Sequence, residues 1–172
     1  VRFYRAFDAR GFDRARMPIC SLTTGEAEVQ AMGAAAAEGH ITCAPYFDTV
    51  DRAESRRFVE ACRATGAADI PISACTEAAY VQVHLFAQAV ARAGRTDPES
   101  VLSVLPTFTL EAPQGPVRVH RDNHHTYLWP RIGRVRADGR FDILQTAAAP
   151  VRPDPYMIAP DALDWGLEAA GG

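Results

Sequence analysis

The 172-residue sequence contains no lysine, no C-x-x-C pair and no apolar run near the length of about 20 residues that a membrane-spanning helix requires. All 18 basic residues are arginine, and the formal net charge of −3 favours neither nucleic acid nor an anionic membrane as a partner. The N-terminus lacks the regions of a signal peptide and begins at Val1 rather than Met. We therefore expect a soluble fragment of a longer parent protein, without membrane insertion or direct nucleic-acid binding.

Common catalytic motifs are also absent. The sequence has no G-x-S-x-G, no H-E-x-x-H, no P-loop and no G-x-G-x-x-G. His120, His124 and His125 lie together at a predicted turn, but they lack the helical i, i+4 spacing and the cysteine partner typical of metal sites. We therefore expect no enzymatic activity, no cofactor and no metal, and interpret the histidines as partners of turn backbone groups.

Four cysteines, Cys20, Cys43, Cys62 and Cys75, lie among apolar residues. A free cysteine packs as a small hydrophobic residue, so we expect four reduced thiols in the core rather than a disulfide framework. Reduced thiols favour a reducing compartment, which for this chain means the cytoplasm.

Short apolar strands alternate with amphipathic helices in the first part of the chain. Strands are predicted over 17–22 and 41–47, and helices over 23–38 and 53–64. This alternation is typical of an α/β fold with parallel strands and right-handed crossovers.

A long helix is predicted over 73–93 and ends at Gly94, and a shorter one follows up to residue 105. The long helix has an apolar stripe that we expect to face the core. The stripe consists of Ala79, Val83, Phe86, Ala87 and Val90.

Between residues 112 and 145 the pattern changes to three strand-like segments. Turn signals separate them at 113–115, 121–123 and 137–139, the last of which is a D-G hairpin turn. The pattern predicts an antiparallel β-meander. Aspartates are interleaved with its arginines, so we interpret this arginine cluster as a solvated sheet face rather than a nucleic-acid surface.

Four short motifs, G-P-V, N-H-H, R-I-G and D-G-R-F, occur in this order from residue 115 to 141. This order resembles the C-terminal half of the amide- and urea-type members of the type I periplasmic binding proteins. The segment R-P-D-P-Y at 152–156 makes the sequence more similar to the amide-sensing negative regulators of aliphatic amidase operons.

The resemblance implies a partial type I periplasmic-binding fold, in which strand-helix units of a parallel sheet are followed by the β-meander. It divides the chain into four parts: the end of the second lobe (1–50), the crossover and return to the first lobe (51–111), the meander near the interlobe connections (112–146), and an extended C-terminal tail (147–172).

The resemblance also implies a function. Such a regulator is a cytoplasmic sensor that binds a short aliphatic amide or urea between hinged lobes, and it releases an RNA-binding antiterminator protein when the ligand binds. The alternative is an extracytoplasmic solute-binding protein of an ABC transporter for urea, short amides or branched-chain amino acids, with an ABC permease as partner. Both interpretations are compatible with a homodimer.

Ser21, Thr23 and Thr24, at the junction between the first predicted strand and the following helix, are the main ligand-binding candidates. In doubly wound folds ligands bind beyond the carboxyl ends of the strands, and hydroxyls suit a neutral ligand that carries both C=O and NH2. The amino acid receptors of the family have a glutamate near this junction, whereas Glu26 has the spacing of a capping box with Thr23. Tyr46, which ends the second strand, is a ligand-binding candidate or a packed aromatic residue.

Overall fold

The structure, a computed structural model, describes residues 1–66 and 70–155. Its elements in chain order are α1 (Arg2–Ala9), β1 (Cys20–Ser21), α2 (Glu26–Met32), α3 (Ala34–Ala37), β2 (Ile41–Ala44), α4 (Ala53–Ala64), α5 (Ala74–Ala93), α6 (Pro98–Val104), the 3-10 helix η1 (Leu105–Thr107), β3 (Thr109–Ala112), β4 (Gly115–Arg118), β5 (Arg131–Val135) and β6 (Phe141–Thr146). The α/β class predicted from the sequence is confirmed.

A four-stranded sheet has the order β1-β2-β5-β6. The predicted parallel pairing holds for β1 and β2, whereas β5 pairs antiparallel with both of its neighbours. Tyr4 of α1 and Val29 of α2 share a core with Val135 and Phe141 of the sheet. We call these elements, residues 2–44 and 131–146, the four-stranded unit.

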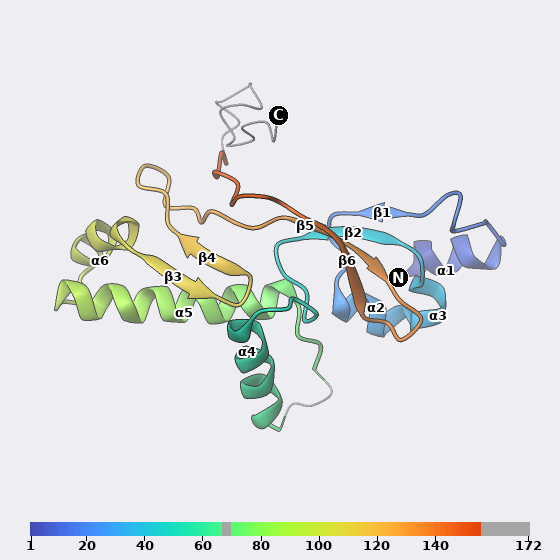
Figure 1. The fold of residues 1–172 in the computed structure, drawn as a ribbon, viewed down its shortest axis with the longest axis horizontal. Helices are drawn as coiled ribbons and strands as arrows, with labels where there is room; N and C mark the ends of the chain where they lie inside the picture. Colours follow the sequence, from blue (N-terminus) through green and yellow to red (C-terminus); the bar gives the residue numbers. More distant parts are fainter. Residues whose placement is uncertain (67–69, 156–172) are drawn as a thin grey trace.

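The second unit is built around the antiparallel pair β3 and β4. Val81, Leu85 and Ala89 of α5 pack with Leu110 of β3 and Val117 of β4 in a separate core. We call residues 74–118 the hairpin unit. The two units lie side by side along the longest axis of the molecule (Figure 1).

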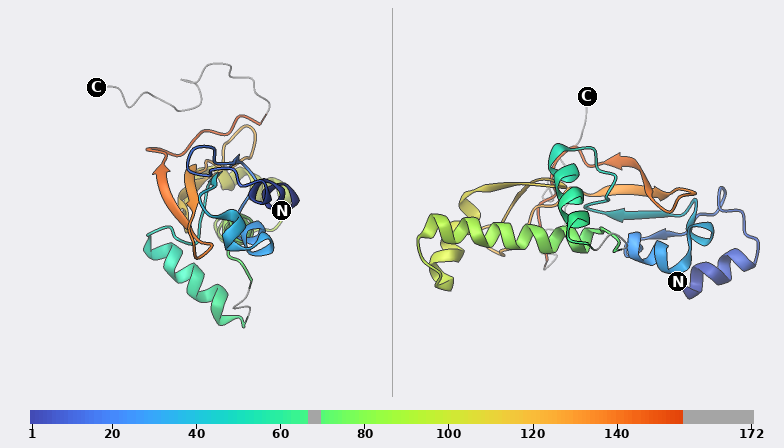
Figure 2. Two further views of the ribbon diagram at one scale, coloured as in Figure 1. Left: turned by 90° about the vertical axis from the view of Figure 1, so that its right-hand side faces the viewer. Right: turned by 90° about the horizontal axis from the view of Figure 1, so that it is seen from below.

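Helix α4 stands between the two units and projects away from them (Figure 2). Tyr46 and Val50, which precede it, form a third core with Phe58 of α4 and with Ile72. The carboxyl ends of β1 and β2 both point toward the middle of the molecule, where the chain passes between the units (Figure 1).

The predicted helix boundaries agree with the structure for the later helices. The prediction 53–64 matches α4, and α5 begins after Ser73 and ends at Gly94, whose φ of 66° is the left-handed conformation that glycine favours. The single helix predicted over 23–38 is wrong. It begins at Glu26, and Gly33, with a φ of 90°, separates α2 from α3.

The single β-meander is also wrong in its pairing. β4 pairs with β3 in the hairpin unit, whereas β5 and β6 join β2 in the four-stranded sheet. The D-G hairpin turn between β5 and β6 is confirmed, since Gly139 has a φ of 81° and its N–H donates to the carbonyl of Arg136 at 3.0 Å.

The orientation predicted for the long helix is wrong as well. α5 buries the face of Val81, Leu85 and Ala89, while Val83 is 66% exposed and Phe86 is 55% exposed. The helix therefore has two apolar faces, of which one is covered within the described residues.

All four cysteines are free, but Cys20 and Cys75 are exposed rather than packed in the core. Among the described helices, none combines the length and hydropathy that a membrane span requires.

Candidate functional site

The loop after β1 gathers three of the four predicted ligand-binding residues. The Ser21 hydroxyl accepts the N–H groups of Thr23 and Thr24 at 3.1 and 3.2 Å and the Thr24 hydroxyl at 2.9 Å. Thr24 is buried, and its hydroxyl lies 3.0 Å from that of Tyr4. Thr23 is exposed at the end of β1. The loop is thus fixed from inside by Ser21 and Thr24 and offers Thr23 to the solvent.

The carboxylates near this loop have protein partners. Glu28, rather than Glu26, caps α2, because its Oε2 accepts the N–H of Gly25 at 2.9 Å. The capping box predicted for Thr23 and Glu26 is therefore wrong. Glu26 accepts the N–H of Asp48 at 3.3 Å, and burial raises its pKa to about 7.

Tyr46 lies apart from this loop. Its side chain is fully buried, its hydroxyl lies 2.9 Å from that of Ser55, and its ring packs edge-on against Phe58. Burial raises the pKa of the phenol. The structure places Tyr46 in the core beneath α4, as the packed-aromatic alternative describes.

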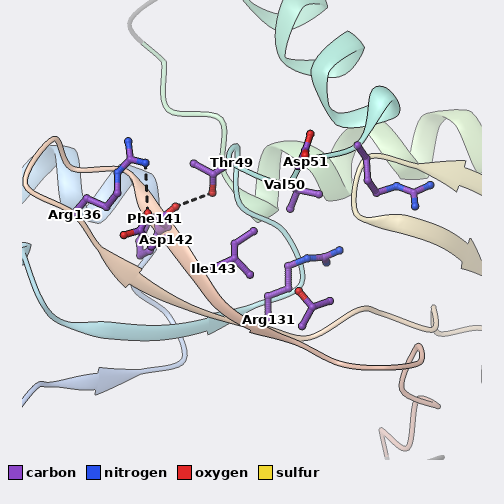
Figure 3. Close-up of a pocket in the computed structure, with 10 residues that line it drawn as sticks. Thr49, Val50, Asp51, Arg131, Arg136, Phe141, Asp142 and Ile143 are labelled. Carbon is purple, nitrogen blue, oxygen red and sulfur yellow. Dashed lines mark hydrogen bonds and ion pairs between the residues drawn. The ribbon is translucent and has the colours of Figure 1, made fainter.

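A pocket of about 450 Å³ lies at the opposite edge of the sheet, between β6 and the segment that precedes α4. Residues 49–52, before α4, face residues 141–143 of β6 across it, and the Thr49 hydroxyl donates to the carbonyl of Phe141 at 2.8 Å (Figure 3). Arg131 lines the same pocket. Because β1 and β6 are opposite edges of the sheet, this pocket is separate from the Ser21–Thr24 loop.

Three buried polar residues form a network that the sequence did not predict. Both carboxylate oxygens of Glu77, in α5, accept N–H groups of Gln114, from the backbone at 3.4 Å and from the side chain at 2.9 Å. Arg131 donates to the carbonyl of Gln114 at 2.6 Å and is 5% exposed, which corrects its assignment to a solvated face. A single carboxylate on the face shared with Val81 and Leu85 is the sequence signal that points to Glu77.

Burial raises the pKa of Glu77 to about 7, while the hydrogen bonds from Gln114 and the charge of Arg131 act against this rise. Arg131 of the four-stranded unit and Trp129, two residues before it, thus both contact one turn of the hairpin unit, because Trp129 donates its backbone N–H to the Gln114 side chain at 3.3 Å. Because these donors and acceptors are buried and pair with one another, the arrangement is a structural contact between the two units rather than an open ligand site.

The N-H-H turn contacts the R-P-D segment. The Asn123 side chain donates to the carbonyl of Pro153 at 3.1 Å, and Arg152 lies 3.4 Å from the ring of His120. Tyr156 lies outside the described residues. Within the described part of the chain, no group of three His, Cys, Asp or Glu residues is placed to bind a metal ion.

Comparison with known proteins identifies the family. The family model described as "Periplasmic binding protein domain" matches residues 1–161. The chain belongs to this family. Its α/β arrangement is a partial type I periplasmic-binding fold, as the sequence resemblance predicted.

Solved structures of ABC transporter solute-binding proteins are similar to it. One from Rhodopseudomonas palustris, in complex with 3,4-dihydroxybenzoic acid, has a TM-score of 0.76 and 21% identity over 90% of this chain and 43% of its own. A leucine-binding protein from Thermotoga maritima has a TM-score of 0.67 and 18% identity over 84% of this chain and 40% of its own. The chain spans less than half the length of these proteins.

A curated relative from Geobacillus stearothermophilus carries the name "Limonene hydroxylase". It is 31% identical over 126 residues, which are 73% of this chain and 23% of that protein. The match covers a small part of the named protein, whereas the family model covers most of this chain and describes a binding domain.

Proposed function

We propose that this chain forms part of an extracytoplasmic receptor that binds a small neutral solute, an amide or urea, and delivers it to an ABC permease. Residues 2–44 and 131–146 would belong to the second lobe and residues 74–118 to the first. The loop of Ser21, Thr23 and Thr24 would contact the solute.

The observation that carries the proposal is the exposed residue Thr23 just beyond the carboxyl end of β1, in a loop whose conformation Ser21 fixes. A hydroxyl both donates and accepts, which matches the NH2 and C=O groups of an amide. The similar solved structures are receptors of ABC transporters, which favours this role over the cytoplasmic regulator.

The test is calorimetric titration of the full-length gene product with acetamide, urea, leucine and 4-hydroxybenzoate. Replacing Thr23 by valine keeps the shape of the side chain and removes the hydroxyl, so we expect acetamide affinity to fall about fivefold, the equivalent of one hydrogen bond. Thr109→Val, at an exposed position of strand β3, is the matched control. Unchanged acetamide affinity in Thr23→Val would remove this loop from the site.

The amide-sensing regulator is the second candidate. The contact between Asn123 and Pro153 favours this regulator role, because the contact joins two of the segments that carry the resemblance to these regulators. Cell fractionation distinguishes the two functions: a receptor is found outside the cytoplasm, and a regulator inside it together with its antiterminator.

A further inference from the structure

The β3–β4 turn, which together with the first two residues of β4 spans 113–116, is held from one side by α5. Glu77 accepts both the backbone N–H and the side-chain amide of Gln114, and both residues are at most 2% exposed. Water cannot replace either partner at such burial, so breaking this contact leaves polar groups unpaired in the interior. The position of the turn relative to α5 is therefore strongly fixed.

The same turn holds the start of β5 from the other side. The indole N–H of Trp129 donates to the carbonyl of Pro116 at 2.8 Å, and Arg131 donates to that of Gln114 at 2.6 Å. The Trp129 ring covers Gly115 so closely that a Cβ there would lie 2.9 Å from the indole nitrogen, and the φ of Gly115 is 131°. Glycine is thus the residue that lets the two units approach at this point.

Arg131 extends the connection to the ligand-binding edge. Its guanidinium also donates to the carbonyl of Pro45, the residue that follows β2. β2 pairs in parallel with β1, whose carboxyl end carries Ser21, Thr23 and Thr24. A continuous series of hydrogen bonds, buried at Glu77 and Gln114 and part-buried at Pro45, therefore runs from α5 through the turn to the edge where the solute would bind.

We infer that the β3–β4 turn is the joint that sets the position of the four-stranded unit relative to the hairpin unit, with Glu77 as its positioning residue. The effect on ligand affinity rests on the proposed function, whereas the geometry of the joint does not. A joint with few alternative partners limits the relative positions of the two units. Weakening the joint lets the two units adopt more relative positions, and a smaller fraction of these positions has the geometry that binds the ligand.

Spin labels on Cys20 and Cys75 test the geometry without ligand. Both cysteines are exposed, one in β1 and one in α5, and the other cysteines of the full-length gene product are replaced by serine. In this background we expect a narrow distribution of distances between the two spin labels, and in Glu77→Leu we expect a broadened or displaced distribution. Glu77→Gln keeps one acceptor oxygen for the 2.9 Å hydrogen bond from the Gln114 side chain and stays narrow, as does the control Glu99→Gln on the exposed surface of α6.

A second variant covers the outcome that Glu77→Leu does not fold. Replacing both partners, Glu77→Leu with Gln114→Leu, removes both polar side chains and restores part of the stability, while the side-chain hydrogen bonds that tie the turn to α5 and to Trp129 stay absent. Its distance distribution is expected to remain broad or displaced. A folded double variant with the narrow distribution of the parent would overturn the inference.

Acetamide titration of the same variants separates the joint from the proposed ligand. Acetamide affinity is expected to fall about tenfold in the double variant and to be retained in Glu77→Gln, within the usual range of coupling through packed networks. If the wild type binds no acetamide while the distances change as described, the joint stands and the proposed ligand is wrong. If acetamide binds equally to all variants and the distances are unchanged, the joint is wrong and the proposed ligand stands.

Discussion

The substitution Glu77→Gln should change the pH dependence of stability in a defined direction. Glu77 is fully buried, and its pKa rises from 4.5 in the unfolded chain to about 7 in the folded one. Between these two values the folded state binds more protons than the unfolded state, so its stability decreases as pH rises. At about 1.4 kcal/mol per pH unit, this carboxyl makes the folded protein about 3 kcal/mol less stable at pH 8 than at pH 4.5. Glutamine does not titrate, so the Glu77→Gln variant does not lose this stability as pH rises.

Urea unfolding of the full-length wild type and variant at several pH values between 4.5 and 8 measures the effect. Glu26 and His40 also have shifted pKa values, the first raised and the second lowered by burial, but they titrate in both proteins and cancel in the difference. We expect the free energy of unfolding of the variant, minus that of the wild type, to increase by about 3 kcal/mol over this range. A difference independent of pH would show that Glu77 keeps an ordinary pKa and remains charged beside Arg131.

Three further outcomes follow from packing. Gly133→Ala should cost about 1–3 kcal/mol in thermal unfolding, because the added Cβ would lie 2.7 Å from the Phe47 ring. Tyr46→Phe should cost about 1 kcal/mol through the lost hydrogen bond of its buried hydroxyl, with acetamide affinity unchanged in titration. Exposed Cys20 and Cys75 should react with a thiol reagent before the two part-buried cysteines do, and equal rates for all four would contradict the packing.

Local signals in the sequence predicted the elements better than their partners. The Gly94 end of the long helix and the D-G turn at 138–139 act within a few residues, and both are found in the structure. No local signal shows that β4 pairs with the preceding strand β3 while β5 pairs with the distant β2. The alternation of apolar and polar residues in a strand is the same whichever strand it pairs with. The predicted meander failed for this reason.

The long helix shows the same limit for orientation. α5 carries apolar residues on two faces, so a periodic stripe through Val83 and Phe86 is as regular as the buried one through Val81 and Leu85. Periodicity identifies an amphipathic helix when one face is polar, and it cannot choose between two apolar faces. The carboxylate of Glu77 lies on the covered face, where the side chain of Gln114 is its hydrogen-bond partner.

Under the proposed function, the preference of the loop after β1 for a neutral or a charged solute would depend on whether the neighbouring carboxylates have hydrogen-bond partners within the protein. A carboxylate without a protein partner recognises the ammonium group of an amino acid. Here Glu28 accepts the N–H of Gly25, and Glu26 accepts that of Asp48 with its pKa raised to about 7, so both are engaged within the protein. Under the proposed function, the exposed residue Thr23 would contact the solute, and its hydroxyl would suit urea or a short amide better than a zwitterionic amino acid.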